Sequence, residues 1–294
     1  MKDVGILAEN LSLDNRKLSS LTRRFPHYAD ELAKLLLGRD VREATDEELE
    51  LSYHEITSRL FEPTIETSED FSENILRAER ALIAAETVRV LTERATIRSF
   101  LPELAAQEGR CVYFRNAYSD EAYRVFAPLL TAPTASYTDS PAEACREVYN
   151  ELANFAILPI SSSQEGVFSG IAREVSRYEL ALTLTCEVAL PGKDETMTMG
   201  LFAQTPIAVE NAEAIEAVLF CDDRHTLTAL MLSAEHLDYP VVSAEAIAET
   251  EGFHYAYRVS FAAAEHASFF RIWLLLRCEY PHHRICSIRR KLIR

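Results

Sequence analysis

The feature that most constrains this fold is a change of apolar periodicity at residue 110. Upstream, apolar residues recur at helical spacing, whereas downstream short apolar runs of strand length alternate with helical segments. The predicted strands of this middle segment are 111–114, 135–137, 155–160, 180–190 and 197–203, and the predicted helices are 120–130, 140–151 and 163–178. Strands that alternate with helices favour an α/β layer structure with parallel strand pairing.

The C-terminal segment has a different order of elements. From residue 214 it reads strand, helix, strand, strand, helix, strand. The predicted strands are 215–221, 241–248, 253–262 and 285–292, and the predicted helices are 227–237 and 267–277. This βαββαβ order predicts a ferredoxin-like module, a fold that implies no function by itself.

The segment before residue 110 is predicted to be helical. The predicted helices are 18–36, 45–61 and 72–104. Gly38 can end the first helix, Thr45 and Glu48 form a capping box that opens the second, and Pro63 is expected to stop it. The fold class is therefore α/β, or α+β overall, and the predicted domains are a helical domain (1–109), an α/β lobe (110–206) and a ferredoxin-like domain (207–294).

Composition excludes several functional classes. The chain of 294 residues has a formal net charge of −16, which repels nucleic-acid phosphates. No apolar run approaches the roughly 20 residues of a membrane helix, and the N-terminus lacks a signal-peptide pattern, so we expect a cytoplasmic protein. The 6 cysteines form no C-x-x-C pair and the adjacent His282 and His283 point apart, so we expect neither a metal nor another cofactor.

Three stretches of the α/β segment carry a resemblance to a known family. They are 117–119 after the opening strand, 157–166 with its Pro-Ile-Ser-Ser-Ser run, and 178–190. In this order they resemble the prephenate dehydratase family, and the βαββαβ segment lies where that family has its ACT domain, which binds phenylalanine and mediates feedback inhibition. The resemblance covers residues 110–294 and implies a periplasmic-binding-protein-like α/β lobe followed by an ACT domain.

The sequence also departs from the family pattern at places that matter for the chemistry. Only 192–196 separate the strand that leaves the first lobe from the strand that returns, so the second catalytic lobe is predicted to be deleted. The returning Thr-Arg-Phe reads Met197-Thr198-Met199, and the Glu-Asn pair reads Ser161-Ser162. Holding a dicarboxylate calls for cationic or N–H donors, and expelling hydroxide calls for a positioned acid. The departures imply a degenerate, non-catalytic lobe.

Two groups of residues are candidate ligand contacts. In the lobe they are Tyr118, Ser119, Ser161, Ser162 and Ser163. An alternative interpretation is that the three consecutive serines cap a helix, and that Tyr118 and Ser119 serve core packing and an N-cap.

In the ACT-like segment the candidates are His225, Thr226, Leu227 and Glu245. The family has a Gly-Ala-Leu turn at 225–227, where a histidine side chain now fills space, and Glu245 is what remains of its Glu-Ser-Arg-Pro stretch. We expect a small carboxylate or amino acid as ligand and a homodimer formed through the ACT-like domain.

The N-terminal helices raise a second enzymatic possibility. Chains in which a chorismate mutase precedes the dehydratase begin with three helices, and that mutase binds its dianionic substrate with several arginines and a lysine. The basic residues available here are Arg16, Lys17, Arg23, Arg24, Lys34, Arg39 and Arg42. The long helix comes third rather than first, and the mutase motif does not match residue by residue.

Three functions follow from these observations. The first is a non-catalytic or altered regulatory relative of the dehydratases in phenylalanine metabolism. The second is an active prephenate dehydratase or chorismate mutase, and the third is a structural interaction protein with an inherited fold. The sequence determines neither the ligand nor the number of subunits.

Overall fold

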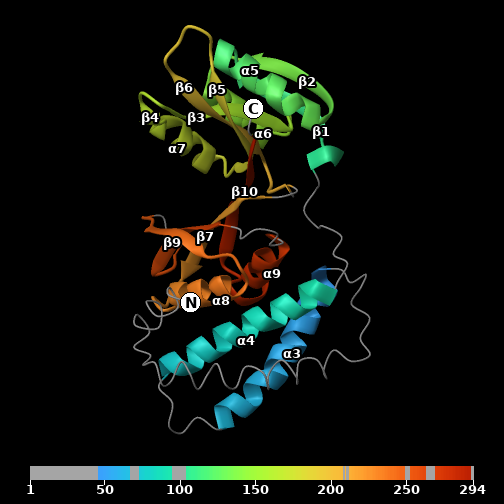
Figure 1. Cartoon of the computed structure of the whole chain (residues 1–294), viewed down its shortest axis with the longest axis vertical. Coiled ribbons are helices and arrows are strands. Elements are labelled where there is room, and N and C mark those ends of the chain that lie inside the picture. The colour runs from blue at the N-terminus through green and yellow to red at the C-terminus, as the bar shows by residue number, and fades with distance from the viewer. Residues whose placement is uncertain are drawn as a thin grey trace. The chain divides into compact units, whose positions relative to one another are not determined.

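The computed structural model of the chain divides into two compact units (Figure 1). Unit 1 comprises residues 1–98 and 218–284, and unit 2 comprises residues 99–217 and 285–294. The structure describes residues 46–66, 73–94, 104–207, 209, 212–248, 252–262 and 269–292. The predicted first helix and the seven basic residues considered for a mutase site lie outside the described residues. The two predicted domain boundaries, at 109/110 and 206/207, stay predictions.

Unit 2 is built on a mixed sheet. Its strands are β1 (Glu108–Phe114), β2 (Thr131–Thr138), β3 (Phe155–Ser162), β4 (Gly166–Val167), β5 (Ala181–Ala189), β6 (Thr196–Ala203) and the later part of β10 (His283–Leu292). The strand order is β2-β1-β3-β6-β5-β10, with β4 beside β3. β1 is parallel to β2 and β3, and β10 is parallel to β5, but β6 is antiparallel to both of its neighbours. The predicted parallel pairing is confirmed for β1 with β2 and β3 but not for β6, because a strand that returns through a hairpin must reverse direction.

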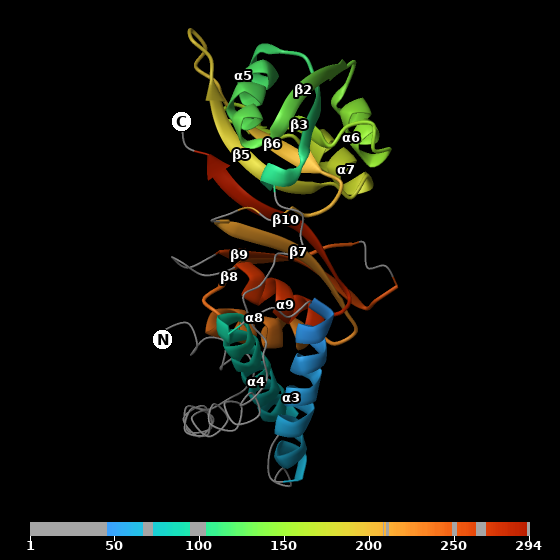
Figure 2. The same ribbon diagram turned by 90° about the vertical axis from the view of Figure 1, so that its right-hand side faces the viewer.

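Helices cover both faces of this sheet (Figure 2). They are α5 (Ala117–Phe126), α6 (Pro141–Tyr149) and α7 (Ser169–Arg177), with short 3₁₀ turns at Leu104–Ala106 and Ala127–Leu129. Alternate residues of β3 point to opposite faces: Phe155 and Ile157 join the buried cluster around α5, whereas Ala156 and Leu158 join the cluster under α6 and α7. β3 is therefore buried on both sides, which explains why its sequence is continuously apolar.

The beginnings of two helices test the capping predictions. Ser140 caps α6 as predicted, since its Oγ accepts from the Glu143 N–H at 3.2 Å and Pro141 occupies the first helical position. The predicted helix from Ser163 is wrong in its start, because α7 begins at Ser169. Residues 163–168 instead form a turn and β4, and Gly166 adopts φ +74, a conformation that glycine adopts at little cost.

Unit 1 contains the predicted ferredoxin-like arrangement. Its elements are β7 (Ala214–Cys221), α8 (Thr226–His236), β8 (Val241–Ala246), β9 (Tyr255–Ala262), α9 (Phe269–Glu279) and the start of β10, and β7 begins in unit 2. The strand order is β10-β7-β9-β8, in which the first and third strands of the βαββαβ unit lie at the centre. Figure 1 shows α8 and α9 on the same face of these strands.

Two N-terminal helices pack on that helical face. α4 (Glu73–Arg94) lies against α8 and α9, and α3 (Asp46–Glu66) lies against α4 and α9. α3 continues beyond Pro63, contrary to prediction, because the residues after a proline still donate their own N–H groups. Ala78, Ala81 and Ala85 of α4 are buried, and such small side chains allow helices to approach closely.

No helix among the described residues combines the length and apolar character needed to cross a bilayer.

Because Gly109 has no side chain, β1 can approach the start of β2 closely. A Cβ at residue 109 would lie 2.8 Å from the Pro133 Cα and 2.9 Å from the Leu130 Cβ. We expect Gly109→Ala to lower the free energy of unfolding by about 1–3 kcal/mol through overpacking. Gly170→Ala, in a helix with open space around it, is the control and is expected to stabilise by roughly 0.4–1 kcal/mol. Urea denaturation measures both, and a neutral Gly109→Ala would contradict the close-approach argument.

Candidate functional site

The candidate site in unit 2 lies where the chain changes faces of the sheet. β1 is the strand between β2 and β3; α5 connects β1 to β2 on one face, and α6 connects β2 to β3 on the other. Ligands of open α/β sheets bind at the carboxyl ends of strands at such a switch point. Tyr118 and Ser119 follow the carboxyl end of β1, and Ser161 to Ser163 end or follow β3. The structure thus brings both predicted groups to the same edge of the sheet.

Two backbone N–H groups at the N-terminus of α5 already have a hydrogen-bond acceptor within the chain. The Asn116 Oδ1 accepts from the N–H groups of Tyr118 at 2.9 Å and Ser119 at 3.0 Å, and its Nδ2 donates to the Ser119 Oγ at 3.0 Å. Asn116 is therefore the N-cap, and the proposed capping role of Ser119 is wrong. Sequence reasoning missed Asn116, although an asparagine just before a helix is a capping signal. Two N–H groups that could hold an anion are consequently occupied.

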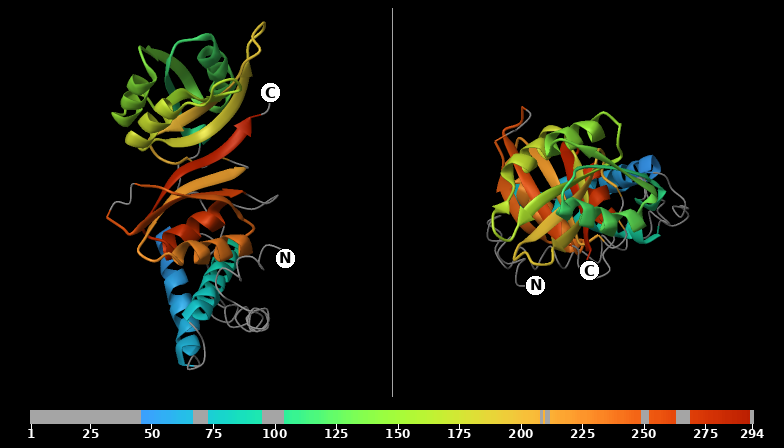
Figure 3. Two further views of the ribbon diagram at one scale, coloured as in Figure 1. Left: turned by 90° about the vertical axis from the view of Figure 1, so that its left-hand side faces the viewer. Right: turned by 90° about the horizontal axis from the view of Figure 1, so that it is seen from above.

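The β5–β6 hairpin, the yellow pair of strands in Figure 3, ends in a turn. A residue after this turn is the partner of the Tyr118 side chain. The turn is tight: the Lys193 N–H donates to the Leu190 carbonyl at 3.1 Å, and Gly192 has φ +77 after Pro191. Beyond this turn, the Tyr118 hydroxyl lies 3.3 Å from a carboxylate oxygen of Glu195 and 3.5 Å from its carbonyl oxygen. The hairpin therefore places an acidic side chain directly against the phenol.

This acidic contact changes the electrostatics of the site. Burial and the Glu195 carboxylate both raise the pKa of Tyr118, because each disfavours the phenolate. The Lys193 Nζ lies 5.1 Å from the centre of the Tyr118 ring, where it makes a cation–π contact. The neutral phenol is thus held as a hydrogen-bond donor to Glu195.

The three consecutive serines hydrogen-bond or pair with neighbouring backbone and do not cap a helix. The Ser163 N–H donates to the Thr196 carbonyl at 2.9 Å, and the Thr196 N–H donates to the Ser163 Oγ at 3.0 Å. The Ser162 Oγ accepts from the Glu165 N–H at 2.9 Å, and Ser161 pairs with Thr198 of β6. The capping interpretation of the serines is wrong, because β3 continues through Ser162 and turns into β4. Their role as ligand contacts stays a prediction.

A second polar group lies beside the switch point, at the end of β1. The Tyr113 hydroxyl donates to the Asp120 Oδ1 at 3.1 Å, and the Arg115 Nε lies 3.8 Å from the Asp120 Oδ2. The Arg115 guanidinium also stacks over the Tyr137 ring at 4.8 Å. The cation nearest to β1's carboxyl end is thereby paired with an acid and an aromatic ring of its own chain.

The predicted contacts of the ferredoxin-like module lie on two different elements. Thr226 and Leu227 form the first turn of α8, and His225 precedes them with helical angles of φ −79 and ψ −12, its N–H donating to the Asp223 Oδ1 at 3.0 Å. Glu245 lies on β8 opposite Arg258 of β9 and is exposed. The turn at 225 thus has ordinary helical backbone angles, and the His225 Nε2 accepts from the Arg224 Nε at 3.3 Å. Within the described residues, no three histidine, cysteine or acidic side chains form a metal-binding group.

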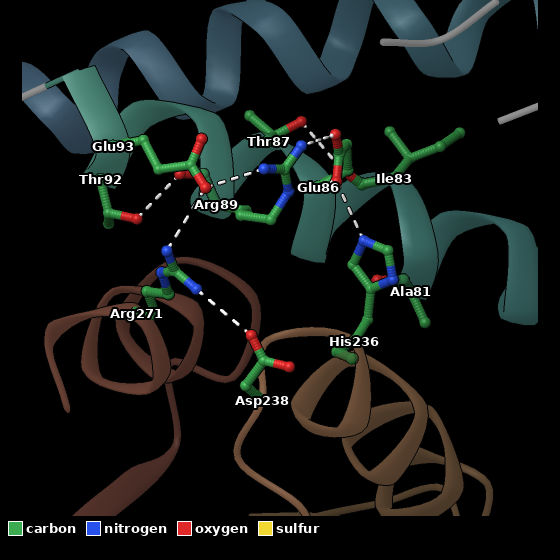
Figure 4. Close-up of polar contacts among 11 residues, drawn as sticks. Ala81, Ile83, Glu86, Thr87, Arg89, Thr92, Glu93, His236, Asp238 and Arg271 are labelled. Carbon is green, nitrogen blue, oxygen red and sulfur yellow. Dashed lines mark hydrogen bonds and ion pairs between the residues drawn. The ribbon is translucent and has the colours of Figure 1, made fainter. Parts of the chain in front are cut away.

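Sequence reasoning missed a buried ionic cluster that joins α4 to α8 (Figure 4). The Glu86 carboxylate is buried; its Oε2 lies 2.8 Å from the Arg89 Nε and 2.9 Å from the His236 Nε2. Burial by itself would raise the pKa of Glu86, but the hydrogen bonds from Arg89 and His236 outweigh it and lower the pKa to about 2. On the same helix pair, the buried Ser233 Oγ donates to the Ala81 carbonyl at 2.8 Å.

The ionic cluster generates a prediction about acid stability. A carboxylate whose pKa is lowered by folding stabilises the native state above its unfolded pKa of 4.5, and the stabilisation is lost as pH falls toward about 2. We expect Glu86→Gln to lower the free energy of unfolding at pH 7, and the difference from wild type to shrink between these two pH values. Urea denaturation at pH 7, 4 and 3 measures it. Glu165→Gln, at an exposed side chain, is the control, and a pH-independent Glu86→Gln deficit would contradict the linkage.

Together the fold and the switch-point edge define a mixed α/β lobe that precedes a ferredoxin-like module in the sequence. No protein-family model and no curated protein matches this chain.

Several solved structures resemble the chain. One is GqqA, described as a novel type of quorum-quenching acylase (15% identity, 61% of this chain and 94% of that chain, TM-score 0.43). Another is a prephenate dehydratase from Streptococcus mutans (15% identity, 62% of this chain and 98% of that chain, TM-score 0.44). A third is a prephenate dehydratase from Arthrobacter aurescens in complex with L-Phe (12% identity, 60% of this chain and 88% of that chain, TM-score 0.43).

Proposed function

We propose that this chain is a non-catalytic, prephenate-dehydratase-like protein that acts as a regulator in aromatic amino-acid metabolism. The observation that carries the proposal is the hairpin turn at Pro191–Gly192. In the resembling family the chain leaves this lobe to build a second wall of the active site. Here β5 turns back at once and pairs with β6 along its length. A lobe with one wall does not exclude water from a reacting substrate.

The charge at the switch point supports the same proposal. Prephenate carries two carboxylates, and binding them calls for cationic or N–H donors. At this edge the Tyr118 hydroxyl faces the Glu195 carboxylate, and two N–H groups of α5 are held by Asn116. An acid at this position repels a dianionic substrate. Arg115, which follows the carboxyl end of β1, is paired with Asp120.

The ferredoxin-like module supports the regulatory part of the proposal. It has the element order and strand order expected of an ACT-like domain. We propose that it binds an amino acid or another small carboxylate near 225–227, and that it forms a homodimer. β8 ends the sheet of this unit and is mostly exposed, so it offers backbone groups to a second copy.

The catalytic part of the proposal is tested with prephenate. We expect purified protein to form phenylpyruvate no faster than the uncatalysed background, because the second wall is missing and the Glu195 carboxylate opposes a dianionic substrate. Glu195→Gln removes the opposing charge at the site, and it is expected to leave the rate at background. Chorismate consumption is measured in parallel and is expected to be absent. Turnover of prephenate would contradict the proposal, and turnover of chorismate alone would assign a mutase activity to the chain.

The regulatory part is tested by thermal unfolding with L-phenylalanine, L-tyrosine, L-tryptophan and phenylpyruvate. A ligand that binds only the folded state stabilises it by about 2.7 kcal/mol at 100 times its Kd, so the melting temperature should rise with ligand concentration. His225→Gly removes the side chain at the turn, and we expect it to enlarge the shift. Glu195→Gln lies in the other unit and should leave the shift unchanged. No shift with any of the four compounds would favour a structural interaction protein.

A further inference from the structure

The outer edge of β2 is an unprotected sheet edge. β2 ends the strand order of unit 2, and among the described residues no strand pairs with its outer side. Seven of its eight residues are exposed, and Thr138 is the buried one. A strand in this position presents free backbone N–H and C=O groups to solvent, ready to pair with another chain.

This edge carries none of the charged side chains with which monomeric proteins normally protect an exposed strand. Charged residues make up 26% of the chain, yet β2 reads Thr-Ala-Pro-Thr-Ala-Ser-Tyr-Thr without a charge. Pro133 and the irregular register between Glu108 and Arg110 disturb only its beginning. From Thr134 onward the strand pairs with β1 in unbroken parallel register. Five consecutive residues, 134–138, therefore form a regular and neutral edge.

We propose that residues 134–138 pair antiparallel with the same segment of a second copy of this chain, around a two-fold axis at Ser136. This register places Ser136 opposite its own copy, Ala135 opposite Tyr137 and Thr134 opposite Thr138. The small Ala135 leaves room for the exposed Tyr137 ring, which Arg115 already holds from one side. A sequence that complements itself in this way is what a symmetric interface requires.

The match between the small Ala135 and the exposed Tyr137 selects a second copy as the occupant, and the neutral strand removes local charge repulsion between the copies. Each chain carries a formal net charge of −16, so two copies repel each other wherever their acidic surfaces meet. A strand without charges lets them approach with little local repulsion. An acidic or basic peptide would find no charged side chain on β2 to select it. The interface differs from the dimer proposed for the ferredoxin-like module, whose outer strand is β8.

The oligomeric state of matched variants tests the proposal. By sedimentation velocity, Ser136→Lys is expected to reduce the number of subunits by half, because two lysines would face each other at the axis. Ser136→Ala is the control: like the lysine variant it loses the 3.4 Å contact of the Ser136 Oγ with the Cys111 carbonyl, but it adds no charge and should assemble like wild type. Thermal unfolding of both variants verifies that they fold.

Two further variants separate this interface from the one at β8. Val242→Lys, at an exposed residue of β8, is expected to leave the β2 interface intact. Ser136→Cys should form a disulfide-linked dimer on mild oxidation, because opposite residues of an antiparallel pair have Cβ atoms about 4.5–5.5 Å apart. A monomeric wild type, an unchanged assembly in Ser136→Lys, or a Ser136→Cys protein that does not cross-link would each overturn the proposal. Dissociation by Val242→Lys alone would assign dimerisation to β8 and leave the proposed function intact.

Discussion

The tight turn at Pro191–Gly192 is the constraint on which the lobe depends. Because Gly192 accepts φ +77, the chain reverses within a few residues and β6 returns between β5 and β3. β6 then hydrogen-bonds to both neighbours and completes the sheet, so Phe155, Ile157 and Leu201 share one core with α5. The turn also determines which groups lie at the exposed edge of the sheet. It places the Glu195 carboxylate beside the Tyr118 hydroxyl and the Thr196 N–H beside the Ser163 hydroxyl.

In the other unit, the corresponding constraint is a buried charge. Glu86 lies inside the packing of α4 against α8, and a buried carboxylate is strongly unfavourable unless it is paired. Arg89 comes from the same helix, whereas His236 comes from α8, so the helices must keep one relative position to satisfy the acid. Arg271 of α9 lies 3.4 Å from Glu93 and 3.6 Å from Asp238, which adds a more exposed link to the same group of helices. The N-terminal helices are thereby tied to the helical face of the ferredoxin-like module.

The candidate sites of the two units differ in how far the chain itself occupies them. In the lobe, the N–H groups of α5, the Tyr118 hydroxyl and the Ser163 hydroxyl are engaged by the chain itself through Asn116, Glu195 and Thr196. In the module, α4 packs on the helical face, β8 is mostly exposed, and residues 225–227 are half-buried. Regulation by a small ligand requires an accessible site on a stable fold, and catalysis requires an enclosed one. The proposed sensing role, as opposed to turnover, rests on this difference between the two units.

Local signals in the sequence determined most of the elements. Ser140-Pro141 fixed the start of α6, the continuous apolar run at 155–160 identified a strand buried on both faces, and the βαββαβ order predicted the ferredoxin-like module. Such features depend on neighbours in sequence, so they can be read directly. Tertiary structure alone decided the antiparallel pairing of β6, the fate of the serines after β3, and the partners of Tyr118 and Glu86. Each of these depends on residues far apart in the chain, and no local propensity specifies which distant group will satisfy a buried hydrogen bond or charge.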